Sequence, residues 1–194
     1  FNIDTIAHNL SNVNTVGYKK NRAEFEDLLY QSLRLAGTPA SLHTQRGTRY
    51  PVGVEAGLGV KVNSTMKLHT QGAPKQTEQW SDIAIFGEGF FKVKLAGDQG
   101  FAYTRNGAFK ADRDRYLLTA NGQYLEPPVQ MPEGYLPSSV KITKDGFITC
   151  RTAASGNETV EVGQISLFRF VNPNGLKAVG ENLFVETEAS GPEI

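Results

Sequence analysis

The chain has 194 residues, with 20 Lys and Arg against 20 Asp and Glu, three His and one Cys. This length suits one domain of modest size, or one domain with an appendage, and a single cysteine excludes an intrachain disulfide. Residues 1–97 carry 11 basic and 8 acidic side chains, and residues 98–194 carry 9 and 12. Neither half has the large excess of basic side chains that binds a polyanion, so no nucleic-acid binding is expected. No apolar run approaches the roughly 18 residues that span a bilayer, so no membrane insertion is expected.

The first thirteen residues have the spacing of a helical apolar stripe. Four aliphatic side chains follow one another at intervals of 3, 4 and 3 residues, as in the a and d positions of a coiled coil: Ile3, Ile6, Leu10 and Val13. We expect the helix to end near residue 12, and Gly17 is a candidate for the glycine that stops it.

Three asparagines gather where this helix should end: Asn9, Asn12 and Asn14. One interpretation is local, because Asn side chains compete for backbone groups and favour caps and turns. The other is that these amides hydrogen-bond backbone across a seam between subunits, where a buried amide fixes the register. Tyr18 is a candidate contact of the same kind, either within the chain or across that seam.

The helix is too short to persist alone. Burying four aliphatic side chains contributes at most about 6–12 kcal/mol, whereas ordering 13 residues costs at least ~13 kcal/mol of backbone entropy. Isolated helices below about 12–15 residues are marginal in water. The stripe therefore needs a partner helix, from beyond this sequence or from another copy, and residues 1–30 are interpreted as an assembly segment.

Residues 31–59 contain five Gly, two Pro and five Ser or Thr, with too few periodic apolar residues for a core element. So long a stretch without regular structure is uncommon in a compact domain and is usually a linker or a functional arm. We expect an irregular extended arm here.

The pattern changes at Val60, where apolar and polar residues begin to alternate up to His69, which predicts a half-buried strand. Further strand signals lie at residues 83–85, 91–95, 140–142 and 165–171. Three residue pairs are typical of hairpin turns: Asn106-Gly107, Asn121-Gly122 and Asp145-Gly146. The predicted fold is mainly β, with a β-rich domain over residues 60–194 that follows the arm and the short N-terminal α-helix of a coiled-coil assembly segment.

The sequence nominates no catalytic, cofactor-binding or metal-binding residue. His8, His43 and His69 lie far apart and have no neighbouring Cys or His at ligand spacing. Cys150 ends a strand pattern and is expected to be a small buried hydrophobic side chain. Residues 111–115 lack the Gly and Glu of a calcium loop and are interpreted as a charged turn. We therefore expect no cofactor and no enzymatic activity.

Residues 6–20, IAHNLSNVNTVGYKK, closely resemble the motif A-N-N-L-A-N-x-N-T-x-G-[YF]-K near the N-terminus of bacterial flagellar rod and hook proteins. Ile6, His8 and Ser11 depart mildly from it. Similar stretches follow in the same order over nearly the whole chain, at residues 22–34, 57–72, 82–93, 102–113 and 162–191. Residues 31–59 resemble the insertion that distinguishes the distal-rod branch of this family from the hook protein. A proximal-rod or hook paralogue is the alternative within the family.

The resemblance implies a structural axial subunit of the flagellar basal body, exported by the flagellar type III system. Such a subunit polymerises helically into the distal rod, which crosses the periplasm and transmits motor torque to the hook. Implied partners are other copies of the chain, the proximal-rod proteins, the hook protein and the surrounding ring proteins. In this family a C-terminal helix packs with the N-terminal one, and it would follow Ile194. The expected subunit-interface residues are Ile3, Ile6, Asn9, Leu10, Asn12, Val13, Asn14, Gly17 and Tyr18.

Two functions of other classes compete with this interpretation. A β-rich surface binding module, such as an adhesin or carbohydrate binder, would use Trp80, Phe90, Phe91 or Tyr103 as an aromatic platform. Aromatic residues at strand spacing are more often core, however. A hydrolase would need titratable groups clustered in a pocket, and the sequence indicates none.

Overall fold

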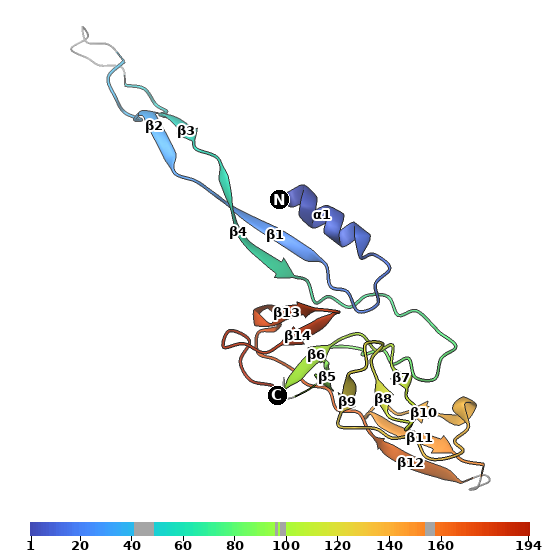
Figure 1. The fold of residues 1–194 in the computed structure, drawn as a ribbon. Coiled ribbons are helices and arrows are strands. Elements are labelled where there is room, and N and C mark those ends of the chain that lie inside the picture. The colour runs from blue at the N-terminus through green and yellow to red at the C-terminus, as the bar shows by residue number, and fades with distance from the viewer. Residues whose placement is uncertain (41–48, 96, 98–99, 154–157) are drawn as a thin grey trace. The chain divides into compact units, whose positions relative to one another are not determined.

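The computed structural model describes residues 1–40, 49–95, 97, 100–153 and 158–194, so that His43 lies outside the described residues (Figure 1). The fold is mainly β, as predicted, with one α-helix in these ranges, α1 (Asn2–Ser11). The chain divides into two compact units. We call residues 1–7 and 21–67 the ribbon unit, and residues 8–20 and 68–194 the β unit. These units cut the chain at other positions than the expected segments 1–30, 31–59 and 60–194.

The ribbon unit is built from two antiparallel strand pairs. β1 (Asn21–Asp27) pairs with β4 (Val60–Lys67), and β2 (Tyr30–Arg34) pairs with β3 (Val54–Gly57). The expectation of wholly irregular backbone over residues 31–59 is therefore wrong. Two strands that satisfy each other's backbone donors and acceptors need no periodic apolar face, so the missing periodicity did not exclude them.

The predicted strand from Val60 exists, but from Val60 to Thr65 it is exposed on both faces, and partial burial begins only at Met66. Val60 is 67% exposed and Val62 is 40% exposed. β4 pairs with β1 in the ribbon, not in the β-rich domain that we expected to begin at residue 60. A two-stranded ribbon has no second layer to cover it, so its alternating pattern does not create a core.

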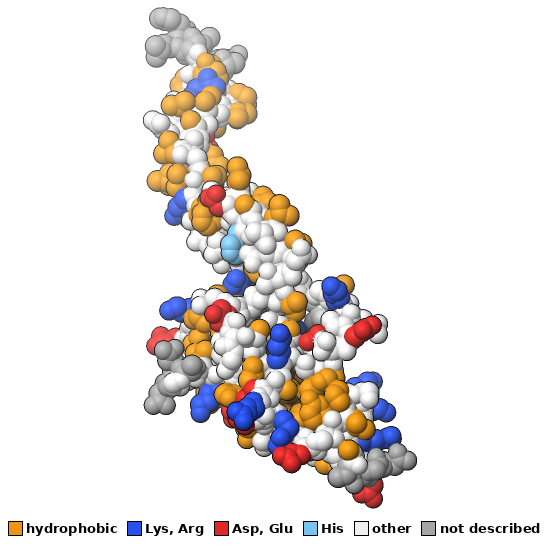
Figure 2. All heavy atoms as spheres, turned by 45° about the vertical axis from the view of Figure 1, so that its right-hand side comes forward, with side chains coloured by type: hydrophobic (Ala, Val, Ile, Leu, Met, Phe, Trp, Pro, Cys, Tyr) orange, Lys and Arg blue, Asp and Glu red, His pale blue; other side chains and the backbone are white. Residues whose placement is uncertain are grey.

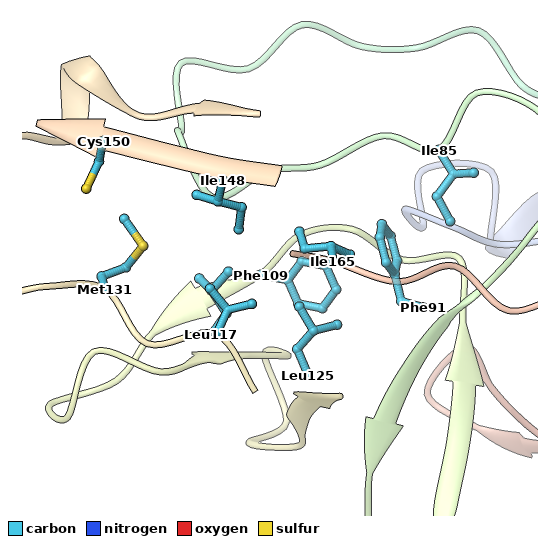
Figure 3. Close-up of a cluster of buried hydrophobic side chains, with 10 residues drawn as sticks. Ile85, Phe91, Phe109, Leu117, Leu125, Met131, Ile148, Cys150 and Ile165 are labelled. Atoms are coloured by element: carbon cyan, nitrogen blue, oxygen red, sulfur yellow. The ribbon is translucent and has the colours of Figure 1, made fainter. Parts of the chain in front are cut away.

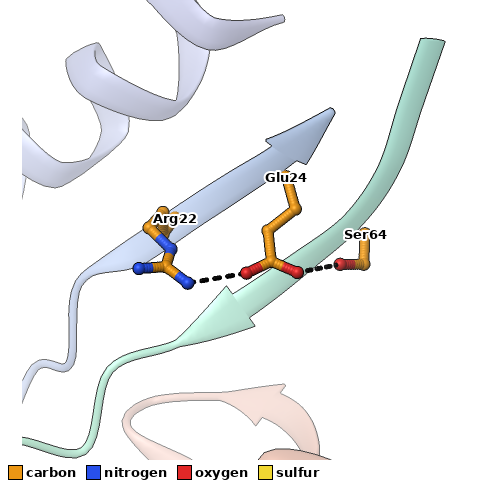
Figure 4. A network of polar contacts seen from close by, with 3 residues as sticks. All are labelled: Arg22, Glu24 and Ser64. Atoms are coloured by element: carbon orange, nitrogen blue, oxygen red, sulfur yellow. Dashed lines mark hydrogen bonds and ion pairs between the residues drawn. The ribbon is translucent and has the colours of Figure 1, made fainter. Parts of the chain in front are cut away.

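Charged side chains of the β1–β4 pair neutralise one another. The Glu24 carboxylate accepts from the Arg22 guanidinium at 2.7 Å and from the Ser64 hydroxyl at 3.1 Å (Figure 4). These hydrogen bonds, that from Arg22 first, hold the pKa of Glu24 below its usual value. Glu26 pairs likewise with Lys61, at 2.6 Å. Exposed ion pairs of this kind contribute little stability but fix the cross-strand neighbours.

The β unit contains two antiparallel sheets. The larger has the order β13-β14-β6-β5-β9-β8-β7 and the smaller the order β10-β11-β12. The strands of the larger sheet are β5 (Phe91–Lys94), β6 (Phe101–Thr104), β7 (Lys110–Ala111), β8 (Leu117–Leu118), β9 (Tyr124–Glu126), β13 (Lys177–Gly180) and β14 (Leu183–Val185). Those of the smaller sheet are β10 (Lys141–Ile142), β11 (Phe147–Arg151) and β12 (Thr159–Gln164). Two short 3₁₀ turns are η1 (Pro137–Ser139) and η2 (Pro173–Gly175).

Side chains from both sheets meet in the main core (Figure 3). The rings of Phe91 and Phe109 pack edge to face with centroids 5.0 Å apart. Cys150 is fully buried among these side chains, as predicted, and burial raises the pKa of its thiol. The buried members of this cluster are Ile85, Phe91, Phe109, Leu117, Leu125, Val129, Met131, Ile148, Cys150 and Ile165.

The proposed aromatic platform is not present. Phe90, Phe91 and Tyr103 are buried, and Trp80 is only partly exposed and packs edge to face on Tyr135. Phe90 and Tyr103 belong to a second buried cluster with Phe170, Leu176 and Phe184. A ring whose faces are covered by neighbours cannot stack on a ligand.

The hairpin predictions hold at two of three positions. Asn121-Gly122 joins β8 to β9, and Asp145-Gly146 joins β10 to β11, with φ of +86° and +83° at the glycines. Asn106-Gly107 is not a hairpin turn. The Asn106 side-chain oxygen accepts from the Ala108 amide at 3.1 Å, and a Cβ at Gly107 would lie 1.6 Å from the Ile83 carbonyl oxygen. Gly107 is therefore required because its backbone lies too close to that of Ile83 to leave room for a side chain.

Two predicted strands are reduced to isolated bridges. Residues 165–171 form no strand, but Phe168 exchanges backbone hydrogen bonds with Phe90 at 2.9 and 2.8 Å, and Arg169 exchanges them with Ile194 at 2.9 and 3.0 Å. Residues 83–85 are irregular, next to the bridge between Asp82 and Ala108. Buried side chains such as Ile85 and Ile165 make a strand-like pattern because they fill the core from irregular backbone.

Candidate assembly site

The predicted apolar stripe is present on the helix and is open to solvent. Ile3, Ile6 and Leu10 lie on α1 and are 79%, 58% and 69% exposed. Val13, in the turn after the helix, is 71% exposed. α1 has no buried residue and ends at Ser11, close to the expected position. We call these four side chains the seam.

The amides of two asparagines are used inside the chain. The Asn12 side chain donates to the His8 carbonyl at 2.9 Å, where it satisfies a carbonyl at the helix end. The Asn12 side-chain oxygen also accepts from the Thr15 hydroxyl at 3.3 Å. Asn9 accepts at its Oδ1 from the Tyr18 hydroxyl at 2.8 Å. These contacts favour the local interpretation, in which the asparagines shape the turn.

Tyr18 folds the end of the motif back onto the helix. Its hydroxyl lies 3.0 Å from His8 Nδ1 as well as bonding Asn9, and the Tyr18 and His8 ring centroids are 5.9 Å apart. Partial burial raises the pKa of Tyr18. The turn between the helix and Tyr18 is thus held by contacts between Tyr18 at its end and the His8 and Asn9 side chains on the helix.

Gly17 does not stop the helix, because α1 ends six residues earlier, at Ser11. It is needed for two other reasons. Its φ is +76°, where only glycine is unstrained. A Cβ there would also lie 2.9 Å from both the Cα and the backbone nitrogen of Asn106. The segment therefore rests directly on the backbone of the β unit to which it belongs.

Two further contacts of this segment were missed by sequence reasoning. The Asn182 side chain donates to the Val16 carbonyl at 2.8 Å, and the Lys19 ammonium donates to the Thr70 carbonyl at 2.7 Å. Glu181 and Asn182 both have positive φ, in the turn between β13 and β14. An Asn in a Gly-Glu-Asn turn signals positive φ, but no local signal connects it to a residue 166 positions away.

Neither a candidate metal site nor a candidate membrane-spanning helix occurs in the described residues. Within residues 1–40, 49–95, 97, 100–153 and 158–194, no three His, Cys, Asp or Glu side chains come together as a metal site. In the same ranges, no helix has the length and apolar character to cross a membrane. What the site presents is apolar surface on α1 and a turn held on the β unit.

Comparison with known proteins gives the family. Residues 84–150 match the family model described as the flagellar hook protein FlgE/F/G D1 domain. Over 194 residues the chain is 47% identical to the flagellar basal-body rod protein FlgG of Borreliella burgdorferi, covering 100% of this chain and 71% of that protein. The chain belongs to the FlgG family. The FlgG of Buchnera aphidicola from Acyrthosiphon pisum is 42% identical over 193 residues, with the same coverage of 100% and 71%.

The FlgG relationship confirms the resemblance seen in the sequence and decides between the paralogues compared. The hook protein FlgE of B. burgdorferi is 41% identical over only 125 residues, which is 64% of this chain and 27% of that protein. FlgG relatives match the chain throughout, including the ribbon. The protein is a structural, non-enzymatic subunit of the flagellar basal-body rod.

Proposed function

We propose that the seam is the surface through which this rod subunit joins other copies into a helical polymer, the distal rod that transmits motor torque to the hook. The observation that carries the proposal is the exposure of all four seam side chains, three on a helix with no buried residue and one in the turn that follows it. Covering them contributes up to about 6–12 kcal/mol. A helix of 10 residues is marginal in water without such cover.

We infer that the turn after α1 is held by Asn9, Asn12, Gly17 and Tyr18, and that Asn14 of the same turn is a further interface residue. The hydrogen bonds of Asn9, Asn12 and Tyr18 close the turn, and Gly17 lets it approach Asn106. A firmly held turn fixes the direction in which the chain leaves the helix. Every copy then has the same backbone path in this turn, and a regular helical polymer requires such identical contacts.

The ribbon is the second proposed contact with neighbouring subunits. Hydrophobic side chains recur on its surface (Figure 2), and large exposed apolar patches are typical of interaction sites. Two strands without a covering layer are marginal in water, so contact with another subunit would stabilise them. The exposed apolar residues of the ribbon strands and their connections are Phe25, Leu28, Leu29, Tyr30, Leu33, Leu35, Val52, Val54, Leu58, Val60 and Val62.

Contacts with proteins other than further copies follow from the position of a distal rod. By resemblance, its ends would meet the proximal-rod proteins and the hook protein, and its outer surface would face the ring proteins. Passage to this position would use the flagellar type III export system. Subunit export and capture at the growing end are both compatible with a seam that stays uncovered until assembly.

Static light scattering tests the seam directly. The full-length protein should form filaments or large oligomers, and the same protein with Ile3, Ile6 and Leu10 replaced by Ser should stay monomeric. Asp4→Ser, an exposed change on the same helix but outside the seam, is the matched control and should assemble normally. Equal assembly of the triple variant and the control would contradict the proposal.

A further inference from the structure

A groove lies beside the turn Val13–Lys19, which follows α1 and which we call the assembly turn. The groove is wholly within the β unit. It has a volume of about 690 Å³. Its lining comes from Val13–Lys19, from Gln71–Thr77 and Gln79, and from Asp82–Ile85, Arg105, Gly107 and Ala108. The groove is therefore bounded by the same turn that positions the seam.

The lining of the groove has an excess of positive charge. Lys19, Lys75 and Arg105 contribute three cations, against the single carboxylate of Asp82. The Arg105 guanidinium donates to the Gln71 side-chain oxygen at 3.2 Å and to the Gly87 carbonyl, both uncharged acceptors. Lys19 donates to a backbone carbonyl, that of Thr70. In the part of the chain that the structure describes, none of the three cations forms an ion pair within 4.0 Å.

The cations at the turn also lie in a partly desolvated place. Burial lowers the pKa of Arg105, and burial together with the Arg105 charge lowers the pKa of Lys19. The negative charge of an incoming carboxylate would offset the repulsion between these two cations and compensate the cost of their burial. Apolar side chains lie among these charges, with Val16, Pro74 and Ile83 in the lining. The groove thus suits an acidic segment that also carries aliphatic side chains.

We propose that this groove receives the segment Asp27–Tyr30, which joins β1 to β2, of a second copy of the chain, with the Asp27 carboxylate facing the cations. This inference rests on the proposed polymer. Asp27 is exposed at the end of β1 and forms no ion pair within the described ranges, whereas Glu24 and Glu26 are already paired. Leu29, two residues further on, is 83% exposed, and Tyr30 is exposed as well. Glu55 of β3 is also exposed and forms no ion pair in these ranges, but its aliphatic neighbour Val54 is only 41% exposed, so Asp27 combines a free carboxylate with the more exposed aliphatic side chain.

Disulfide trapping between two populations of full-length protein tests the contact. One population carries Ala73→Cys in the groove, and the other carries Leu29→Cys beside Asp27. The native Cys150 is fully buried and does not compete. A disulfide requires Cα atoms within about 7 Å, so the mixed polymer should give a disulfide-linked dimer on oxidation. Leu33→Cys, on the same ribbon but four residues further along, is the matched partner that should not cross-link with Ala73→Cys.

A charge exchange provides the second measurement. Lys75→Glu and Asp27→Lys should each raise the critical concentration for polymerisation about tenfold, and the double variant should restore it. Polymers that form normally but trap Leu29→Cys no better than Leu33→Cys would overturn the groove contact while leaving the seam proposal intact. Failure of the unmodified protein to polymerise would instead overturn the proposed function, and this inference with it.

Discussion

The side-chain amide of Asn182 donates a 2.8 Å hydrogen bond to the backbone carbonyl of Val16, joining residues 166 positions apart in the sequence. Asn182 lies in the turn between β13 and β14, and Val16 lies in the turn that follows α1. The bond therefore fastens the assembly turn to the larger sheet of the β unit. The close approach of Gly17 to the Asn106 backbone anchors the same turn to the β unit.

Removing this bond should loosen the assembly turn. Asn182→Gly keeps the φ of +59° accessible and deletes only the side-chain donor. The free energy of unfolding should fall by about 1 kcal/mol, and amide exchange at residues 15–18 should become faster. Glu181→Gly, at the neighbouring position with φ of +54°, is the control. Equal effects of the two changes on exchange would count against the anchoring role of Asn182.

Gly17→Ala should be more damaging than an ordinary glycine substitution at positive φ. Both backbone strain and a Cβ 2.9 Å from Asn106 Cα oppose it, so the loss in unfolding free energy should exceed about 1 kcal/mol. Gly122→Ala is the control, because Gly122 has a φ of +86° but no atom lies within 4 Å of the new Cβ. It therefore measures the cost of the backbone strain without a steric clash. Chemical denaturation of both variants gives the comparison, and a Gly17→Ala protein no less stable than Gly122→Ala would contradict the close approach.

Glu193 should give the β unit a pH-dependent stability. Its carboxylate accepts from Lys92 Nζ and from the Tyr103 hydroxyl, each at 2.6 Å. Burial raises the pKa of Glu193, but these hydrogen bonds and the Lys92 charge outweigh it, so the pKa is lowered overall. The stabilisation is then complete above the ordinary carboxyl pKa of about 4.3 and is lost as the pH falls through the lower folded-state pKa.

Glu193→Gln should therefore lower the free energy of unfolding by about 1.5–3 kcal/mol at pH 7, because it removes the counter-charge of a largely buried Lys92. The difference from the unmodified protein should shrink as the pH falls below about 4. Glu133→Gln is the control, since Glu133 pairs with Arg115 but is largely exposed, and it should cost less than about 1 kcal/mol. A pH-independent effect of Glu193→Gln would refute the charged network.

Deleting residues 31–59 from the full-length protein should change the mechanics of the polymer more than its formation. Asp27 pairs with Val60, so the deletion leaves β1 and β4 joined by the three residues Leu28–Tyr30 and preserves their register. We expect filaments that form through the seam but are less straight, because contacts along the ribbon are lost. Electron microscopy of filament curvature measures this, and unchanged straightness would argue that the ribbon does not stiffen the rod.

Local patterns predicted those parts of the fold that depend on neighbouring residues. The spacing of the four seam residues predicted the helix, and the alternation of apolar and polar residues predicted the strand that begins at Val60. Burial of Cys150 followed from the strand pattern around it. Burial of Val60 was predicted wrongly, because alternation reports which side chains share a face, not whether another layer covers that face.

The candidate site was only partly predictable. Asn9, Asn12 and Tyr18 stand close together in the sequence, so their role in one turn could be anticipated. Asn182 could not be, because its contact with Val16 is created by the sheet and not by local spacing. β1 was missed because Asn21–Asp27 is rich in charged residues. The cross-strand partners of Glu24 and Glu26, which are Ser64 and Lys61, lie 40 and 35 positions away in the sequence.

The most direct test of the account is the solvent accessibility of one seam side chain before and after assembly. Full-length protein carrying Leu10→Cys should be alkylated quickly by a water-soluble maleimide as a monomer, because Leu10 is 69% exposed. In the assembled filament the same thiol should be strongly protected, since a neighbouring copy covers the seam. Equally fast alkylation in monomer and filament would show that the seam stays in solvent, and would contradict assembly through it.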